Sequence, residues 1–150
     1  MMEVKGLGYF VGKEHVMPLR IYYEDTDLSG VVYHANYLKY MERARTEFFR
    51  LAGVTQMADL ESPEPTAWAI RGVELQFMRP GRVDDTLSVK TRCTSISGAR
   101  MTALQRVFCG DTLLVEGRIE ACIITLTGKP RRIPKHIREL LTPFLFEPTP

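Results

Sequence analysis

The chain has 150 residues, which suits one domain with a single hydrophobic core. Its apolar fraction of 45% and charged fraction of 25% are ordinary for a globular protein, and 20 basic against 18 acidic residues leave a net charge of +2. This balance gives no reason to expect nucleic-acid binding, and because the sequence has no run of about 18 apolar residues, we expect no membrane span.

Three cysteines, Cys93, Cys109 and Cys122, are widely spaced and form no CxxC pair. This pattern favours neither a metal site nor a disulfide framework. Free thiols suit a reducing compartment. The N-terminal residues contain no continuous apolar segment of signal-peptide length, and we therefore expect a cytoplasmic protein.

The first segment, residues 1–14, is rich in glycine and charge, and we expect it to be loose. Residues 15–23 then predict a strand. Because Pro18 has no N–H to donate, this strand belongs at a sheet edge or begins near the proline.

A helix is predicted for residues 36–52. Apolar residues recur there at steps of three and four, and charged residues occupy most of the positions between them. The apolar stripe comprises Tyr37, Tyr40, Met41, Ala44, Phe48, Leu51 and Ala52. Asn36 is placed to cap the start of this helix, and Gly53 stands where a C-terminal glycine belongs.

Four strand-like segments follow an acidic, proline-rich loop. They span residues 67–78, 86–96, 100–108 and 112–126, and Pro-Gly, Ser-Gly and Gly-Asp pairs separate them. The tail from Pro134 suits a short helix. Because a helix with a wide apolar face needs a sheet to cover it, these elements predict a single α+β domain with an antiparallel sheet curled around the helix.

The stretch "YYEDTDLSGVVYHANYLKYMERAR", residues 22–45, places Glu24, Asp25 and Asp27 between the first strand and the helix. Gly30 permits a turn there. The start of a helix presents free N–H groups that stabilise a carbonyl oxygen gaining negative charge, and a nearby carboxylate can act as nucleophile or general base. Plain capping chemistry also explains acids before a helix, so the pattern alone leaves both interpretations open.

This stretch resembles the signature of the YbgC-like acyl-CoA thioesterases, which belong to the 4-hydroxybenzoyl-CoA thioesterase family. The matching positions are Asp27, Gly30, Val32, His34, Asn36, Tyr37, Tyr40, Glu42, Ala44 and Arg45, and "LQFMRPGRVDDTLSV" resembles the family's second half. The resemblance implies a hotdog fold, in which an antiparallel five-stranded sheet wraps around one long central helix.

The resemblance also implies roles for the site. Asp27 aligns with the catalytic carboxylate, which attacks a thioester carbonyl or activates a water, and backbone N–H groups around His34 would polarise that carbonyl. Hotdog thioesterases act as homodimers or homotetramers with sites at subunit interfaces. Coenzyme A would be part of the substrate, with no separate cofactor, and acyl carrier protein is the alternative carrier. The family is also linked to the Tol-Pal cell-envelope system, which makes a protein partner conceivable.

Several side chains of the stretch leave alternatives open. Glu24 and Asp25 compete for the role of essential carboxylate. The side chain of His34 is a general acid/base, a substrate contact or a structural residue. Tyr33 and Tyr37 either pack with satisfied hydroxyl groups or line the acyl pocket.

Charged residues further along the chain also have two interpretations. Glu42 lies within the helix, where an acid carries catalysis in a different hotdog branch, although a surface ion pair is the plainer explanation. Arg79 and Arg82 flank the Pro-Gly turn and are candidates to bind the phosphates of coenzyme A. The basic tract at 128–138 is a third candidate, with a solvated surface as the default.

The sequence therefore favours acyl-CoA hydrolysis and leaves two rivals. A hotdog hydratase or dehydratase would use His34 to move a proton next to a carbonyl group. A non-enzymatic acyl-CoA or acyl-carrier binding protein would bind without turnover. The sequence has no G-x-S-x-G motif, so a serine hydrolase mechanism has no support.

Overall fold

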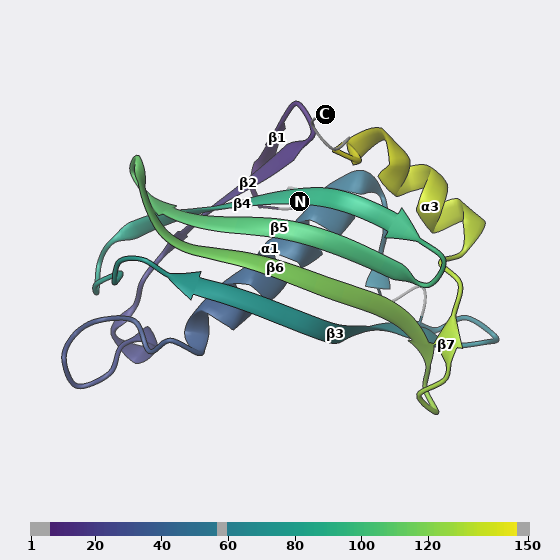
Figure 1. Cartoon of the computed structure of the whole chain (residues 1–150), viewed down its shortest axis with the longest axis horizontal. Coiled ribbons are helices and arrows are strands. Elements are labelled where there is room, and N and C mark those ends of the chain that lie inside the picture. The colour runs from purple at the N-terminus through teal and green to yellow at the C-terminus, as the bar shows by residue number, and fades with distance from the viewer. Residues whose placement is uncertain (1–6, 57–59, 147–150) are drawn as a thin grey trace, which may run out of the picture.

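The computed structural model describes residues 7–56 and 60–146. Its elements in chain order are β1 Tyr9–Val11, β2 Glu14–Arg20, the 3-10 helix η1 Tyr23–Asp25, α1 Asn36–Ala52, β3 Thr66–Phe77, β4 Thr86–Ser97, β5 Arg100–Cys109, β6 Thr112–Thr125, β7 Pro130–Arg131, α3 Lys135–Leu141 and η2 Thr142–Phe144. Figure 1 shows one curved sheet with α1 packed behind it and α3 beside the ends of the strands.

The sheet is antiparallel, with the strand order β1-β2-β4-β5-β6-β3 and β7 added to β6. β3 and β4 are consecutive in the chain, yet they lie three places apart in the sheet. The segment between them, which contains the Pro-Gly pair, is therefore a crossover and not a hairpin turn. This crossover brings residues 78–85 past the start of α1.

The expected count of five strands is wrong for the part of the chain that the structure describes, where the sheet has seven. The two additional strands, β1 and β7, have three and two residues. Segments this short show no alternation that a sequence pattern can detect. The five longer strands match the predicted segments closely.

The expectation of a loose N-terminal segment is also wrong for residues 9–14, while residues 1–6 lie outside the described part of the chain. Tyr9 pairs with Val16, so β1 and the start of β2 form a hairpin. The ring of Phe10 holds this hairpin to the core, since it stacks on Phe144 at 4.3 Å and meets Phe48 edge-on at 5.1 Å. Aromatic burial thus orders a segment whose composition predicts disorder.

The predicted helix is confirmed at both ends, from Asn36 to Ala52. Gly53 ends it in the left-handed conformation, with φ at 97°, as expected of a C-terminal glycine. The buried face includes Phe49, which the predicted stripe omits, whereas Leu51 is only half-buried. The wrap of the sheet explains this, because Phe49 stacks on Trp68 of β3 at 5.2 Å.

The sheet edge predicted from Pro18 is confirmed as well. β1 covers only residues 14–16 of β2, so Pro18 lies beyond the end of β1 and pairs with Ser88 of β4 on its other side. Pro18 therefore lies where β2 has a free outer side, which is where strands tolerate a proline.

Candidate active site

The three carboxylates of the acid-rich loop have different surroundings. Glu24 is exposed in η1, and Asp25 is half-buried at the end of it. The carboxylate of Asp25 accepts a hydrogen bond from the backbone N–H of Tyr22 at 2.8 Å, which closes the 3-10 turn. Asp25 thus braces the loop while Glu24 faces solvent.

Asp27 opens the tight turn that follows, and its side chain is exposed. One carboxylate oxygen accepts the Ser29 hydroxyl at 2.5 Å and the Ser29 backbone N–H at 2.8 Å. Gly30 completes the turn with φ at 79°, a conformation that favours glycine, and its N–H donates to the Asp27 carbonyl. The two Ser29 donors stabilise the ionised form and lower the pKa of Asp27, the hydroxyl having the larger effect.

The start of α1 is tied directly to this loop. The carbonyl oxygen of Asp25 accepts the Tyr33 N–H at 2.9 Å and the side-chain amide of Asn36 at 2.8 Å. Asn36 therefore does not cap the helix as predicted, because its side chain is used to hold the loop, and Ala35 occupies the capping position without a side-chain bond. Within the described residues, no acceptor binds the backbone N–H groups of His34 and Ala35.

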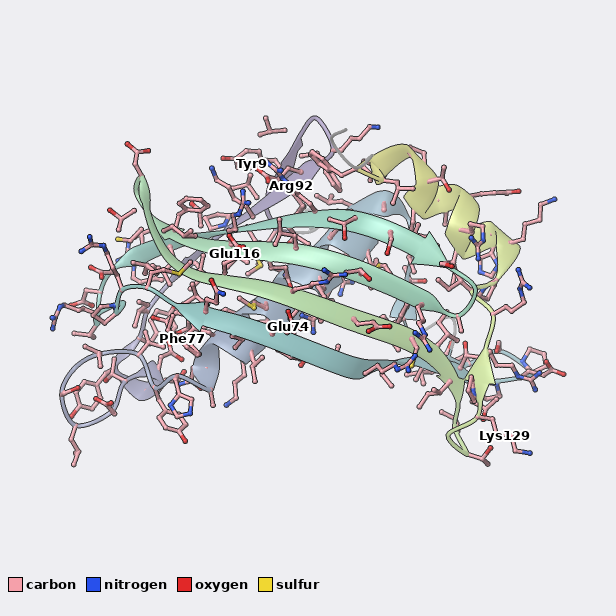
Figure 2. The ribbon with its side chains drawn as sticks, in the orientation of Figure 1. Tyr9, Glu74, Phe77, Arg92, Glu116 and Lys129 are labelled. Atoms are coloured by element: carbon pink, nitrogen blue, oxygen red, sulfur yellow. The ribbon has the colours of Figure 1, made fainter. Side chains whose placement is uncertain are left out.

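The crossover forms the other wall of the site. Gly81 accepts the Val32 N–H at 2.9 Å and donates its own N–H to the Tyr37 hydroxyl at 3.0 Å. Burial raises the pKa of Tyr37, so its hydroxyl stays protonated. Beside it lies an open hollow of about 270 Å³, lined by Val32, His34, Tyr37, Phe77, Met78, Arg79 and Pro80. Phe77, labelled in Figure 2, lies at the end of β3, and its ring contacts the rings of Tyr37 and His34.

The structure brings together three of the predicted site residues in this hollow: His34, Tyr37 and Arg79. The hydroxyl of Tyr37 is satisfied, and Tyr37 also lines the hollow, while its contact with an acyl group stays a prediction. His34 is exposed and packs beside Tyr33, with ring centroids 4.6 Å apart.

The remaining predicted residues surround the hollow without lining it. Asp27 and Gly30 belong to the turn before α1, and Tyr33, which is half-exposed, follows this turn. Arg82 holds the crossover through its backbone, which bridges to Val31 and donates to Asp85 at 3.0 Å.

Glu42 and the basic tract lie elsewhere. Glu42 lines a second cavity, of about 240 Å³, between the later turns of α1 and the first half of β3. The basic tract includes β7, which lies at the opposite end of the sheet from loop 26–35 (Figure 1). Figure 2 accordingly places Lys129 far from Phe77. The tract therefore does not border the hollow.

Sequence reasoning missed two residues that shape the site. Ser29 supplies the donors to Asp27, and Gly81 links the crossover to both the turn and the helix. An aspartate followed two residues later by serine is a signal for a side-chain-stabilised turn, so Ser29 was detectable. Gly81 was not, because its partners come from segments distant in sequence.

No cluster of His, Cys, Asp and Glu able to hold a metal ion occurs among residues 7–56 and 60–146. In the same residues, no helix is both long and apolar enough to cross a bilayer.

Comparison with known proteins places these features in context. The model of the Thioesterase superfamily matches residues 29–119. The acyl-CoA thioester hydrolase YbgC of Escherichia coli O6:H1 is 41% identical over 122 residues, covering 80% of this chain and 90% of that protein. The acyl-CoA thioesterase YbgC of Haemophilus influenzae is 36% identical over 122 residues, covering 81% and 89%. The crystal structure of a probable thioesterase from Bartonella henselae is 39% identical, with a TM-score of 0.78 over 81% of this chain and 99% of that one.

Proposed function

The chain belongs to the Thioesterase superfamily and is a thioester hydrolase of the YbgC-like group, and we propose that it cleaves acyl-CoA thioesters with Asp27 as the acting carboxylate. The observation that carries this assignment is the tie between the Asp25 carbonyl and the first residues of α1. It ties the loop that carries Asp27 to the residues just before α1, where the N–H groups of His34 and Ala35 bind no acceptor among the described residues.

The chemistry follows from these two groups. The N–H groups of His34 and Ala35 donate to the thioester carbonyl and stabilise the negative charge that develops on its oxygen. The Asp27 carboxylate attacks the carbonyl carbon, and collapse of the tetrahedral intermediate expels the coenzyme A thiolate, which takes up a proton. Water then hydrolyses the resulting anhydride, which releases the free acid and restores Asp27. In the general-base route, Asp27 instead removes a proton from the attacking water.

Both routes require an ionised carboxylate, and with its lowered pKa Asp27 is ionised throughout the neutral range. A thioester suits this machinery because its carbonyl has little of the resonance that protects an amide. Hydrolysis then needs no serine–histidine pair.

Thiol release from short, long and aromatic acyl-CoAs tests the assignment. In Asp27→Asn, which keeps the size of the side chain, we expect kcat to fall at least about a hundredfold. Glu24→Gln is the matched control, because it removes an exposed acid from the same loop and should leave kcat within about twofold. Full activity in Asp27→Asn would remove Asp27 from its role, and Glu42→Gln would then be the next variant to assay.

A hydratase or dehydratase is supported less well. That chemistry wants a histidine paired with an acid, and among the described residues His34 forms no ion pair and no hydrogen bond with a carboxylate. Its ring contacts Tyr33 and Phe77 instead. Hydration of an enoyl-CoA without thiol release would favour this rival.

We also assign an assembly, a carrier and a location within the proposal. The protein acts as a homo-oligomer built on a dimer, because the long strand β3 has no strand on its outer side among the described residues. Coenzyme A is the carrier and part of the substrate, and acyl carrier protein is the alternative that a parallel thiol-release assay separates. The three cysteines, all free thiols, suit a reducing cytoplasm.

A further inference from the structure

The cavity that contains Glu42 is separate from the hollow beside Asp27. Its lining comes from α1, from β3, from one residue each of β5 and β6, and from residues 56 and 60, which follow α1. The residues are Glu42, Arg45, Thr46, Phe49, Gln56, Leu60, Thr66, Ala67, Trp68, Ile70, Met101 and Ala121. Arg45 is ten residues beyond Ala35 along the helix, a distance of about 15 Å at the usual rise.

Arg45 is the notable side chain of this cavity. It is half-buried, yet it has no carboxylate within ion-pair distance among the described residues. A guanidinium has five N–H donors, and the described residues occupy only one nitrogen, through a 2.8 Å bond to the side-chain oxygen of Gln105. Burial lowers the pKa of Arg45, an effect that the charge of Glu42 opposes.

The hydrogen-bonded side chain of Gln105 holds the guanidinium of Arg45 in one orientation. Gln105 is fully buried, and its amide group donates to the Met41 carbonyl at 2.9 Å and to the Thr91 hydroxyl at 3.0 Å. These bonds leave its oxygen facing Arg45. A cation that is held in one position, with no carboxylate of the described residues within ion-pair distance, can receive an anion.

The cavity wall adds an aromatic surface. The rings of Phe49 and Trp68 stack at 5.2 Å with 20° between their planes. The indole N–H of Trp68 is buried and has no hydrogen-bond partner in the described residues. Because its nitrogen has almost no accessible surface, Trp68 offers the cavity its ring and not its N–H.

We propose that this cavity binds a carboxylate group carried on an apolar body, with Arg45 pairing with the carboxylate and Phe49 and Trp68 holding the body. A planar carboxylate matches the fork of a guanidinium and can accept from the Arg45 nitrogens that the described residues leave free. Glu42 is the charged neighbour that limits affinity, because its carboxylate repels the ligand. The binding stands independently of the proposed function; only the origin of the ligand rests on it.

The single tryptophan of the chain provides a direct test, because Trp68 lines the cavity. The probes are octanoate and benzoate, each titrated against its neutral amide while tryptophan emission is recorded. We expect saturable changes with the carboxylates and at least about tenfold weaker binding of the amides, as expected for losing a charged hydrogen-bonded partner. Equal binding of acid and amide, or no saturable change, would overturn the proposal without any variant.

Two arginine variants sharpen this result. Arg45→Met should weaken octanoate binding at least about tenfold. Arg43→Met is the matched control, since Arg43 is exposed on the same helix and does not line the cavity. Unchanged affinity in Arg45→Met would contradict the proposal. Should Arg45→Met not fold, the acid–amide comparison on the unaltered protein still decides.

The carboxylate that binds could be the far end of the acyl group or a separate free acid. Kinetic measurements distinguish the two. If it is the far end of the acyl group, the enzyme should prefer dodecanedioyl-CoA over dodecanoyl-CoA in kcat/KM, and Arg45→Met should abolish the preference. If it is a free acid, octanoate should alter the rate without any such preference. A failure of Asp27→Asn to lose activity would affect the catalytic assignment alone, because the fluorescence titration involves no turnover.

Discussion

At the scale of single residues, three acids within four positions acquire three different states. Glu24 is solvated, Asp25 closes a 3-10 turn through its carboxylate, and Asp27 is held ionised by Ser29. Backbone geometry decides these states, since the turn that begins at Asp27 points the Ser29 donors at its own carboxylate. The three carboxylates therefore differ in their hydrogen-bond partners although they are neighbours in the sequence.

Ser29→Ala should shift the acid limb of the pH–rate profile to higher pH. The Ser29 hydroxyl has the largest effect on the pKa of Asp27 and lowers it, so its removal raises that pKa toward the ordinary value. Activity would then be lost at a higher pH as the solution is acidified. The measurement is kcat/KM for thiol release between pH 3 and 7. Ser88→Ala, on β4, is the control, and a limb that does not move in Ser29→Ala would assign it to another group.

Sequence reasoning predicted the turn before α1 and missed part of its internal bonding. Asp27 and Gly30 form this turn and His34 follows it, as the local spacing of the motif predicts, while their roles in a site stay predictions. The capping role predicted for Asn36 failed, since the Asp25 carbonyl competes for its amide. That competitor lies eleven residues away, and local pattern cannot show which partner a side chain selects.

At the scale of elements, α1 and the long strands were predictable because their periodicities are strong. Strand order was not, since β3 and β4 follow each other in the chain yet stand apart in the sheet. Order depends on how the sheet closes around α1, which is a tertiary property. The contact between the crossover and Tyr37 could not be predicted from the sequence for the same reason.

Gly81→Ala should destabilise the crossover. A β-carbon there would lie 2.8 Å from Ile21, 3.1 Å from the Tyr37 hydroxyl and 3.4 Å from Leu114. We expect a loss of about 1–3 kcal/mol in the free energy of unfolding, the usual cost of overpacking. Urea denaturation measures it. Gly72→Ala is the control, because its new atom would meet nothing closer than 3.8 Å, and equal losses in both variants would refute the steric argument.

The N-terminal hairpin should make stability depend on pH through His15. This side chain is fully buried beside Phe10 and Phe48, and burial lowers its pKa below the ordinary 6.5, against smaller opposing effects of Leu7 and Glu47. The unfolded chain therefore binds the additional proton. The contribution of His15 to the free energy of unfolding is therefore full above pH 6.5. Below pH 6.5 it decreases, by at most about 1.4 kcal/mol per pH unit.

Thermal unfolding between pH 8 and 5 tests this dependence. His15→Asn should lose the part of the pH dependence that the histidine causes, whatever its effect on stability at pH 8. His136→Asn, at an exposed position of α3, should retain it. If His15→Asn and the unaltered protein show the same fall between pH 6.5 and 5, the histidine is not its source.

At the scale of the whole molecule, the sheet is unfinished along β3. Within the described residues, no strand pairs with the second side of this twelve-residue strand. Its inward-facing residues are also incompletely covered, with Ile70 48% exposed, Val73 41% and Phe77 51%. A long edge with an apolar face invites a further strand, and two copies of β3 related by a two-fold axis would extend the sheet across a dimer.

If the proposed dimer forms along β3, Val73→Lys should convert it to a monomer, because the substitution places a charge on the apolar face of this edge strand. Sedimentation at micromolar concentration measures the change. The matched control is Val11→Lys, which adds the same charge to β1 at the opposite edge of the sheet, where Val11 is 62% exposed. It should remain dimeric. A dimer that survives Val73→Lys but not Val11→Lys would move the interface to β1, and loss of thiol release in the Val73→Lys monomer would show that the active site needs both subunits.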